Sequence, residues 1–115
     1  MNKKEIKKQY KETVQPMGVF QIKNMQSQKI FIGSAKNIRG RINRIKFQLK
    51  NGSYPNKEIQ KDYNKFGENA FSFDVLDYLE PKDDLNYDYS EELKLLEEMW
   101  LEKLQPYGDK GYHTK

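Results

Sequence analysis

The chain has 115 residues, which is the size of one domain built around a single compact core. Apolar residues make up 36% of it and charged residues 33%, so its helices and strands must be amphipathic around a modest core enriched in Tyr and Phe. The absence of cysteine excludes disulfides, thiolate metal sites and cysteine nucleophiles. The basic residues 1–15 are not followed by an apolar run, so we expect no signal peptide and no membrane span, and a cytoplasmic protein.

The net charge of +4 hides a separation of charge along the chain. Residues 29–65 contain ten Lys or Arg and two acids, whereas residues 68–102 contain twelve acids and two Lys. A basic half suits a polyanion, because each phosphate contact releases counterions and adds salt-sensitive affinity. An ordinary solvated surface whose two halves attract each other would show the same pattern, so charge alone leaves both interpretations open.

The N-terminal half begins with a polar segment and a hairpin. Residues 1–16 are expected to form a polar N-terminal arm or helix, and residues 17–115 the folded domain, because Pro16 interrupts the first segment and it lacks an apolar face. The segments 17–23 and 29–32 are rich in Val, Ile and Phe, which predicts two strands joined by a polar hairpin loop.

An apolar residue recurs about every four positions after Asn37, which predicts a helix capped by Asn37 and ended at Gly52. The members of this stripe are Ile38, Ile42, Ile45 and Leu49.

Three further elements are expected. A second helix runs from Asn56 to Phe66 and ends at Gly67, and alternating apolar residues from Phe71 to Val75 predict a third strand. Ser90, followed by two glutamates, opens a last helix that continues to Leu104. The order strand, strand, helix, helix, strand, helix predicts an α+β fold with a small three-stranded antiparallel sheet flanked by helices.

Two charged residues lie close to apolar stripes. Arg41 falls about 60° from the stripe of its helix, where it can either keep its guanidinium at the rim of the core or clamp a phosphate. Glu97 falls about 40° from the stripe of the last helix, whereas its neighbour Glu98 points to solvent. Carboxylates are rarely buried unless they are paired or bind metal, so Glu97 is either an ion-pair partner or a metal ligand.

Three other residues have ordinary structural interpretations. Phe20 and Phe31 on the first two strands are typical of core packing. The single histidine, His113, lies in the C-terminal tail and is interpreted as an incidental surface residue. With no Cys and one His, nucleophilic triads and zinc sites have no support.

The tripeptides Gly18-Val19-Phe20 and Phe31-Ile32-Gly33 resemble the pair of motifs that names the GIY-YIG nuclease family. The resemblance covers residues 17–113 and implies a GIY-YIG endonuclease-like fold. Further matching segments follow in the same order: Ser34-Ala35-Lys36-Asn37 before Arg41, Asn64-Lys65-Phe66-Gly67, Leu96-Glu97-Glu98-Met99-Trp100 and Gly111-Tyr112.

The resemblance implies hydrolysis of DNA phosphodiester bonds by one divalent metal, Mg²⁺ or Mn²⁺, held mainly by Glu97. It also implies that Arg41 stabilises charge on the phosphate, and that a tyrosine hydroxyl from each tripeptide assists proton transfer. Here the two tyrosine positions are Phe20 and Phe31, which have no hydroxyl. The loss of a general acid or base commonly costs about 10²- to 10⁴-fold in rate.

Two further positions depart from the family pattern. A histidine that often lies one turn after the arginine is Ile45, and a common asparagine after the tail Gly-Tyr is His113. The sequence therefore predicts a metal-dependent DNA endonuclease that is slow, with a non-catalytic nucleic-acid-binding module as the alternative. Whether two copies act together as a homodimer stays open.

A basic face around the first helix is expected to contact DNA phosphates. It consists of Ser34, Lys36, Arg39, Arg44, Lys46, Lys50 and Lys57.

Overall fold

The computed structural model describes residues 15–84 and 86–114, so the expected N-terminal helix over residues 2–14 lies outside the described part. Three strands form one antiparallel sheet in the order β2-β1-β3. The strands are β1 (Met17–Asn24), β2 (Ile30–Ala35) and β3 (Phe71–Leu79), and the helices are α2 (Ile38–Asn51), α3 (Lys57–Phe66) and α4 (Ser90–Leu104). The predicted α+β class and element order are confirmed.

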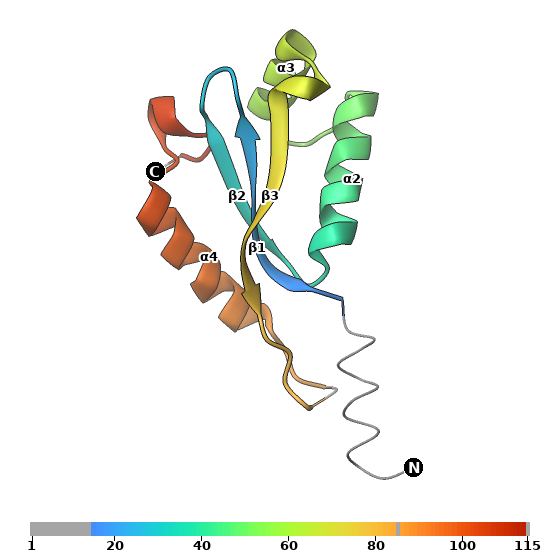
Figure 1. The fold of residues 1–115 in the computed structure, drawn as a ribbon, viewed down its shortest axis with the longest axis vertical. Helices are drawn as coiled ribbons and strands as arrows, with labels where there is room; N and C mark the ends of the chain where they lie inside the picture. Colours follow the sequence, from blue (N-terminus) through green and yellow to red (C-terminus); the bar gives the residue numbers. More distant parts are fainter. Residues whose placement is uncertain (1–14, 85, 115) are drawn as a thin grey trace.

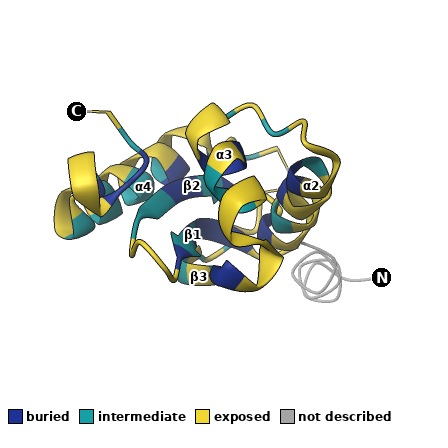
Figure 2. Cartoon of the chain, turned by 90° about the horizontal axis from the view of Figure 1, so that it is seen from above, coloured by how far each residue is buried: buried dark blue, intermediate teal, exposed yellow. Residues whose placement is uncertain are grey.

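The sheet lies between two layers of helices (Figures 1 and 2). On one side, Phe20 and Ile22 of β1 pack with Ile45 and Leu49 of α2 and with Ile59 of α3, and all five are buried. The predicted stripe of the first helix therefore faces the core.

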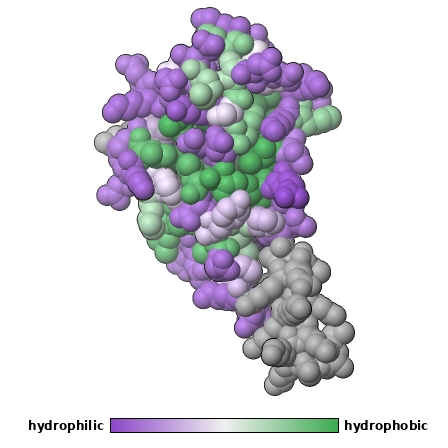
Figure 3. All heavy atoms as spheres, in the orientation of Figure 1, coloured by the Kyte–Doolittle hydropathy of each residue, from purple (hydrophilic) through white to green (hydrophobic). Residues whose placement is uncertain are grey.

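On the other side, Met17 of β1 packs with Tyr89 and Leu93 at the start of α4. Figure 3 shows one face of the molecule, where apolar residues gather over the centre and hydrophilic residues cover the periphery.

The helix ends follow the expected chemistry. The Asn37 side chain accepts a hydrogen bond from the Gly40 N–H at 3.0 Å, and the Asn56 side chain accepts one from the Ile59 N–H at 3.1 Å. Gly52 ends α2 in the left-handed conformation with φ 76°. The capping of α4 differs in detail, because Ser90 begins the helix but its N–H and hydroxyl both donate to the Asp88 carboxylate.

Two strands extend further than the sequence pattern predicted. The pattern placed the end of this strand at Ile32, whereas β2 continues to Ala35 because Gly18, Val19 and Phe20 of β1 pair with its last three residues. Strand β3 likewise continues past Val75, to Leu79. Backbone pairing with β1 supplies hydrogen bonds that local composition does not reveal.

The glycines of the two tripeptides permit close packing within the sheet. Gly18 has φ 152°, and a Cβ there would lie 2.0 Å from the Asp77 carbonyl oxygen of β3. Gly33 pairs with Phe20, and a Cβ on Gly33 would lie 2.7 Å from the Phe20 ring carbon Cζ. A β-bulge between Val19 and Phe20 shifts the pairing of β1 with β3 at the same place. Because Gly33 has no side chain, the Phe20 ring can lie across β2.

Candidate nucleic-acid hydrolysis site

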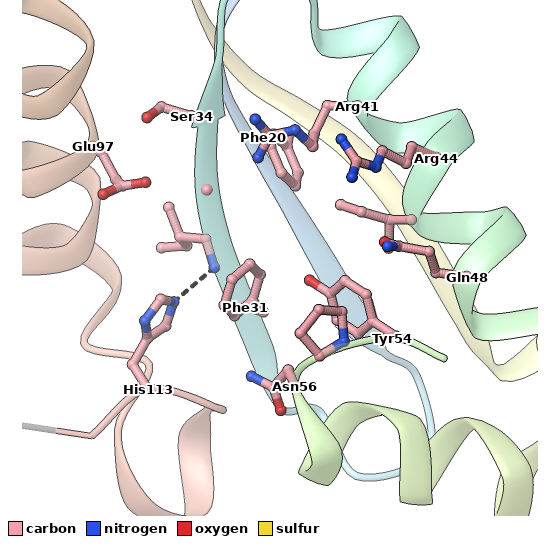
Figure 4. A pocket seen from close by; sticks show the side chains of 14 residues that line it. Phe20, Phe31, Ser34, Arg41, Arg44, Gln48, Tyr54, Asn56, Glu97 and His113 are labelled. Carbon is pink, nitrogen blue, oxygen red and sulfur yellow. Dashed lines mark hydrogen bonds between the residues drawn. The ribbon is translucent and has the colours of Figure 1, made fainter. Parts of the chain in front are cut away.

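A pocket of about 600 Å³ opens at strand β2, where residues from α2, α4, the α2–α3 connection and the C-terminal tail converge (Figure 4). Its polar side chains include Ser34, Arg41, Arg44, Tyr54, Glu97 and His113. The rings of Phe20 and Phe31 form part of the same wall, so all four residues predicted to be catalytic by family resemblance meet in one place.

Glu97 reaches the pocket from α4, with its side chain half-buried. Burial raises the pKa of the Glu97 carboxyl, although the Ser34 hydroxyl and backbone N–H partly counter this by donating hydrogen bonds to it. Among residues 15–84 and 86–114, Glu97 has no ion-pair partner within salt-bridge distance. The described residues thus offer no ion-pair partner for Glu97, and its role as a metal ligand stays a prediction.

Arg41 and Arg44 face the pocket from α2, on the opposite side of β2 from Glu97 (Figure 4). Residues three apart lie on the same side of a helix, so both guanidinium groups are presented to the same opening. Both are exposed, and neither pairs with an acidic residue of the described segments. Two cations without an internal counterion make this rim suitable for an anion such as a phosphate.

The side chains of the pocket include one that could act as a ligand for a divalent metal. No group of three or more His, Cys, Asp or Glu side chains that could hold a metal gathers among the described residues. Glu97 offers carboxylate oxygens, which suit hard ions such as Mg²⁺ or Mn²⁺, and Mg²⁺ commonly keeps several waters beside one or two carboxylates. A metal held mainly by one glutamate therefore fits these residues, whereas a metal cage made entirely of protein ligands does not.

Tyr54 is a pocket residue that the sequence pattern did not single out. It lies between α2 and α3, in a stretch without apolar periodicity, and its half-buried ring packs against the main core. Its backbone N–H donates to the Oε1 of buried Gln60 at 3.1 Å. Proline at position 55 would have suggested only a turn at this point.

His113 corrects the prediction of an incidental surface residue. Its ring stacks on Phe31 with a centroid separation of 4.7 Å, and its Nε2 accepts a hydrogen bond from the Ile32 N–H at 2.8 Å. The neighbouring Tyr112 N–H donates to the Ile30 carbonyl at 3.0 Å, so the tail continues the hydrogen bonding along the free edge of β2. The tail therefore closes one side of the pocket.

The seven residues predicted to contact DNA do not all line this pocket. Ser34 and Arg44 do, whereas Arg39 and Lys46 line a hollow beside Val75 and Tyr78. Lys46 and Lys50 border another hollow near Phe73, and Lys57 borders one at the start of α3. Lys36 is exposed just before α2. A continuous DNA-contacting face formed by all seven stays a prediction, and Ser34 and Arg44 are its members that line the candidate site.

The three-stranded sheet, its flanking helices and the pocket shared by an arginine and a glutamate define a small α+β domain of nuclease type. The chain belongs to the GIY-YIG family, since the model of the GIY-YIG catalytic domain matches residues 16–112. The resemblance inferred from the two tripeptides is thereby confirmed.

Individual relatives agree with this assignment. The chain is 34% identical over 68 residues to intron-associated endonuclease 1 of enterobacteria phage T4, a match that covers 59% of this chain and 27% of that relative. It is also similar to the catalytic domain of homing endonuclease I-TevI, with 26% identity and a TM-score of 0.66 over 84% of this chain and 95% of that one. An alanine mutant of the I-TevI catalytic domain gives 27% identity and a TM-score of 0.62 over 78% of this chain and 84% of that one. The chain thus spans about a quarter of the curated relative it matches.

Proposed function

We propose that this domain is a metal-dependent DNA endonuclease that hydrolyses phosphodiester bonds in the pocket at strand β2. One observation carries the proposal: Arg41 of α2 and the half-buried Glu97 of α4 face the same pocket, and no described residue forms a salt bridge with either. A half-buried carboxylate without a counterion is costly, and the exposed Arg41 has no counterion either, so a pocket lined by both is organised for charged ligands. The match to the GIY-YIG catalytic domain and to endonucleases supports DNA as the substrate.

The arginines would act on the phosphate. Arg41 can donate a fork of two N–H groups to the non-bridging oxygens and stabilise the negative charge that grows on them during attack by water. Arg44, three residues later on the same helix, adds a second cation at the rim of the pocket. Both side chains come from the same helix and line the same pocket, so one phosphate bound there could contact both.

Glu97 would hold the divalent ion, and Ser34 would orient the carboxylate through its two hydrogen bonds. A bound Mg²⁺ or Mn²⁺ supplies activation of water near neutral pH and compensation of the charge on the phosphate. Because burial raises the pKa of Glu97, the ionised form needed for metal binding is favoured as the pH rises above the ordinary range of a glutamate.

The reaction is expected to be slow by comparison with a site that keeps both motif tyrosines. Phe20 and Phe31 line the pocket without a hydroxyl, and Ile45 is buried in the core where a titratable side chain would be costly. The same observation supports a second candidate, a binding module that retains Arg41 and the fold but does not cut DNA.

Incubation of the protein with plasmid DNA, with and without Mg²⁺ or Mn²⁺, tests the proposal. We expect nicking that requires the metal and falls about 10²-fold or more in Glu97→Ala, because that variant loses the metal-holding group. Glu98→Ala is the matched control, since Glu98 is exposed on the same helix. The metal should also raise the melting temperature of the wild type and of Glu98→Ala but not of Glu97→Ala, because a ligand that binds the native state stabilises it.

Two results would contradict the endonuclease. One is equal cleavage and equal metal stabilisation in Glu97→Ala and Glu98→Ala. The other is DNA binding without any cleavage, unaffected by Arg41→Ala and Glu97→Ala, which would establish the binding module instead.

A further inference from the structure

The pocket contains a phenol that neither tripeptide supplies. The rings at the two motif positions, Phe20 and Phe31, have no hydroxyl, whereas Tyr54 enters the same pocket from the connection between α2 and α3 (Figure 4). Tyr54 therefore places in the pocket a phenolic hydroxyl that Phe20 and Phe31 lack, and it comes from the connection between two helices.

The surroundings of Tyr54 hold its backbone in place. Its N–H donates to Gln60 Oε1 at 3.1 Å, while the Gln60 Nε2 donates to the Leu49 carbonyl and to Asn64 Oδ1, both at 3.0 Å. The last turn of α2, the connection and α3 are thus joined by one buried amide. Because the backbone at Tyr54 is held in this way, only the torsions of its side chain lose conformational freedom when a substrate binds.

The Tyr54 hydroxyl is free to act on a ligand, because no described residue forms a hydrogen bond with it. Burial raises the pKa of this phenol, and the positive charge of Arg41 counteracts part of the rise. The side chain is therefore a neutral donor at physiological pH, close to the arginine that would hold the phosphate.

The imidazole and the other hydroxyl of the pocket already make hydrogen bonds. The Nε2 of His113 accepts the Ile32 N–H at 2.8 Å, so the lone pair of its neutral ring is occupied and its remaining hydrogen is on Nδ1. The Ser34 hydroxyl donates to Glu97. Tyr54 is left as the side chain with an unengaged O–H.

We infer that Tyr54 is a catalytic residue that donates its phenolic proton to the oxygen leaving the phosphorus. This inference rests on the proposed endonuclease function. In the step, a water oxygen forms a bond to phosphorus, the bond between phosphorus and the leaving oxygen breaks, and that oxygen takes the Tyr54 proton. The proton released by the attacking water goes to solvent, and the Tyr54 phenolate regains a proton from solvent.

The test compares two kinds of DNA substrate in the wild type and in Tyr54→Phe. One has the normal oxygens, and the other has sulfur in place of a bridging oxygen at the cleaved position, made separately for each side of the phosphorus and assayed with Mn²⁺. Sulfur leaves without needing a proton, because a thiol is far more acidic than an alcohol. We expect Tyr54→Phe to slow cleavage of the oxygen substrate by about 10²- to 10⁴-fold and to cleave one of the sulfur substrates nearly as fast as the wild type.

Controls separate this role from a structural one. Tyr63→Phe removes a hydroxyl from another half-buried ring that packs on the core but does not line this pocket, and it should cleave every substrate at the wild-type rate. DNA affinity and melting temperature should be unchanged in Tyr54→Phe, because the lost hydroxyl has no hydrogen-bond partner among the described residues.

The possible failures are distinguishable. If the wild type cleaves and Tyr54→Phe is slowed equally on oxygen and sulfur substrates, or not slowed at all, the acid role of Tyr54 is wrong and the endonuclease stands. If the wild type cleaves no substrate with either metal, the proposed function and the inference fail together. Phe31→Tyr provides a further check, since it should raise the rate of Tyr54→Phe more than that of the wild type, and equal effects in the two backgrounds would overturn the inference.

Discussion

His113 shows how one side chain can close a sheet edge and form the wall of a site. Its Nε2 takes the place that a backbone carbonyl of a neighbouring strand would occupy for the Ile32 N–H. A protonated imidazole has two N–H groups and no acceptor. Protonation of His113 would therefore place its Nε2–H against the Ile32 N–H and break their hydrogen bond. The stack with Phe31 adds a further cost to moving the ring.

Stability should therefore decrease as the pH falls below about neutrality. Burial lowers the pKa of His113 from its ordinary value of 6.5, so the unfolded state binds the proton more tightly than the folded state. The contribution is fully present above 6.5 and is lost as the pH falls through the folded-state pKa. We expect the melting temperature to fall between pH 7 and pH 5 more steeply in the wild type than in His113→Gln, which keeps an acceptor without titrating. Parallel pH profiles would show that the histidine is not coupled to folding.

At the scale of elements, the placement of α3 against α2 depends on Gln60. This buried amide makes three hydrogen bonds, to Tyr54, Leu49 and Asn64, and the described residues show no buried side-chain N or O atom without a partner. The pocket needs this connection because Tyr54 lies three residues before the start of α3, outside any helix or strand.

Gln60→Ala should lower the free energy of unfolding by about 1 to 3 kcal/mol, because it removes three hydrogen bonds and leaves the Tyr54 N–H without its partner. It should also slow cleavage, since Tyr54 would lose the contact that holds its backbone. Gln26→Ala, in the exposed hairpin loop, is the control and should change neither quantity. Urea unfolding and plasmid nicking measure the two effects, and a loss of stability with full activity would mean that Gln60 does not position Tyr54.

Across the whole molecule, charge is separated as the sequence indicated. The ion pair Lys29–Glu58, with a 2.8 Å contact, lies within the basic half, and Lys82–Glu92, with a 3.5 Å contact, lies within the acidic half. Neither pair joins the two halves, so the cations of α2 remain available to an external polyanion. No helix in the described residues is long and apolar enough to cross a membrane.

DNA affinity should accordingly fall steeply with salt, because each neutralised phosphate releases counterions. Arg44→Ala should weaken binding and reduce the slope of log affinity against log salt by about one. Lys94→Ala, on the exposed face of α4 within the acidic half, should leave the slope unchanged. Affinity measured by fluorescence anisotropy at several salt concentrations tests this, and a flat salt dependence of the wild type would contradict a basic DNA-contacting face.

Much of this molecule follows from local sequence. Apolar spacing near four residues predicted α2 and its buried face, Asn37 and Asn56 predicted two helix starts, and Gly52 and Gly67 predicted two helix ends. These features can be predicted from sequence because helix caps and apolar spacing depend only on residues a few positions apart. Arg41 and Glu97 stood out for the same reason, as charged residues beside apolar stripes, and the ordered motifs indicated the family.

The remaining features depended on contacts between segments distant in the chain. The extension of β2 to Ala35 required pairing with β1, and the hydrogen bond between Ile32 and His113 joins residues 81 positions apart. Tyr54 lies in an irregular connection, where no period predicts the direction of a side chain. Local sequence therefore determined the helices, their caps and the two charged residues of the site. Only the tertiary structure decided that a tyrosine and a histidine outside both tripeptides complete the pocket, because burial and hydrogen bonding at those positions arise from packing against other elements.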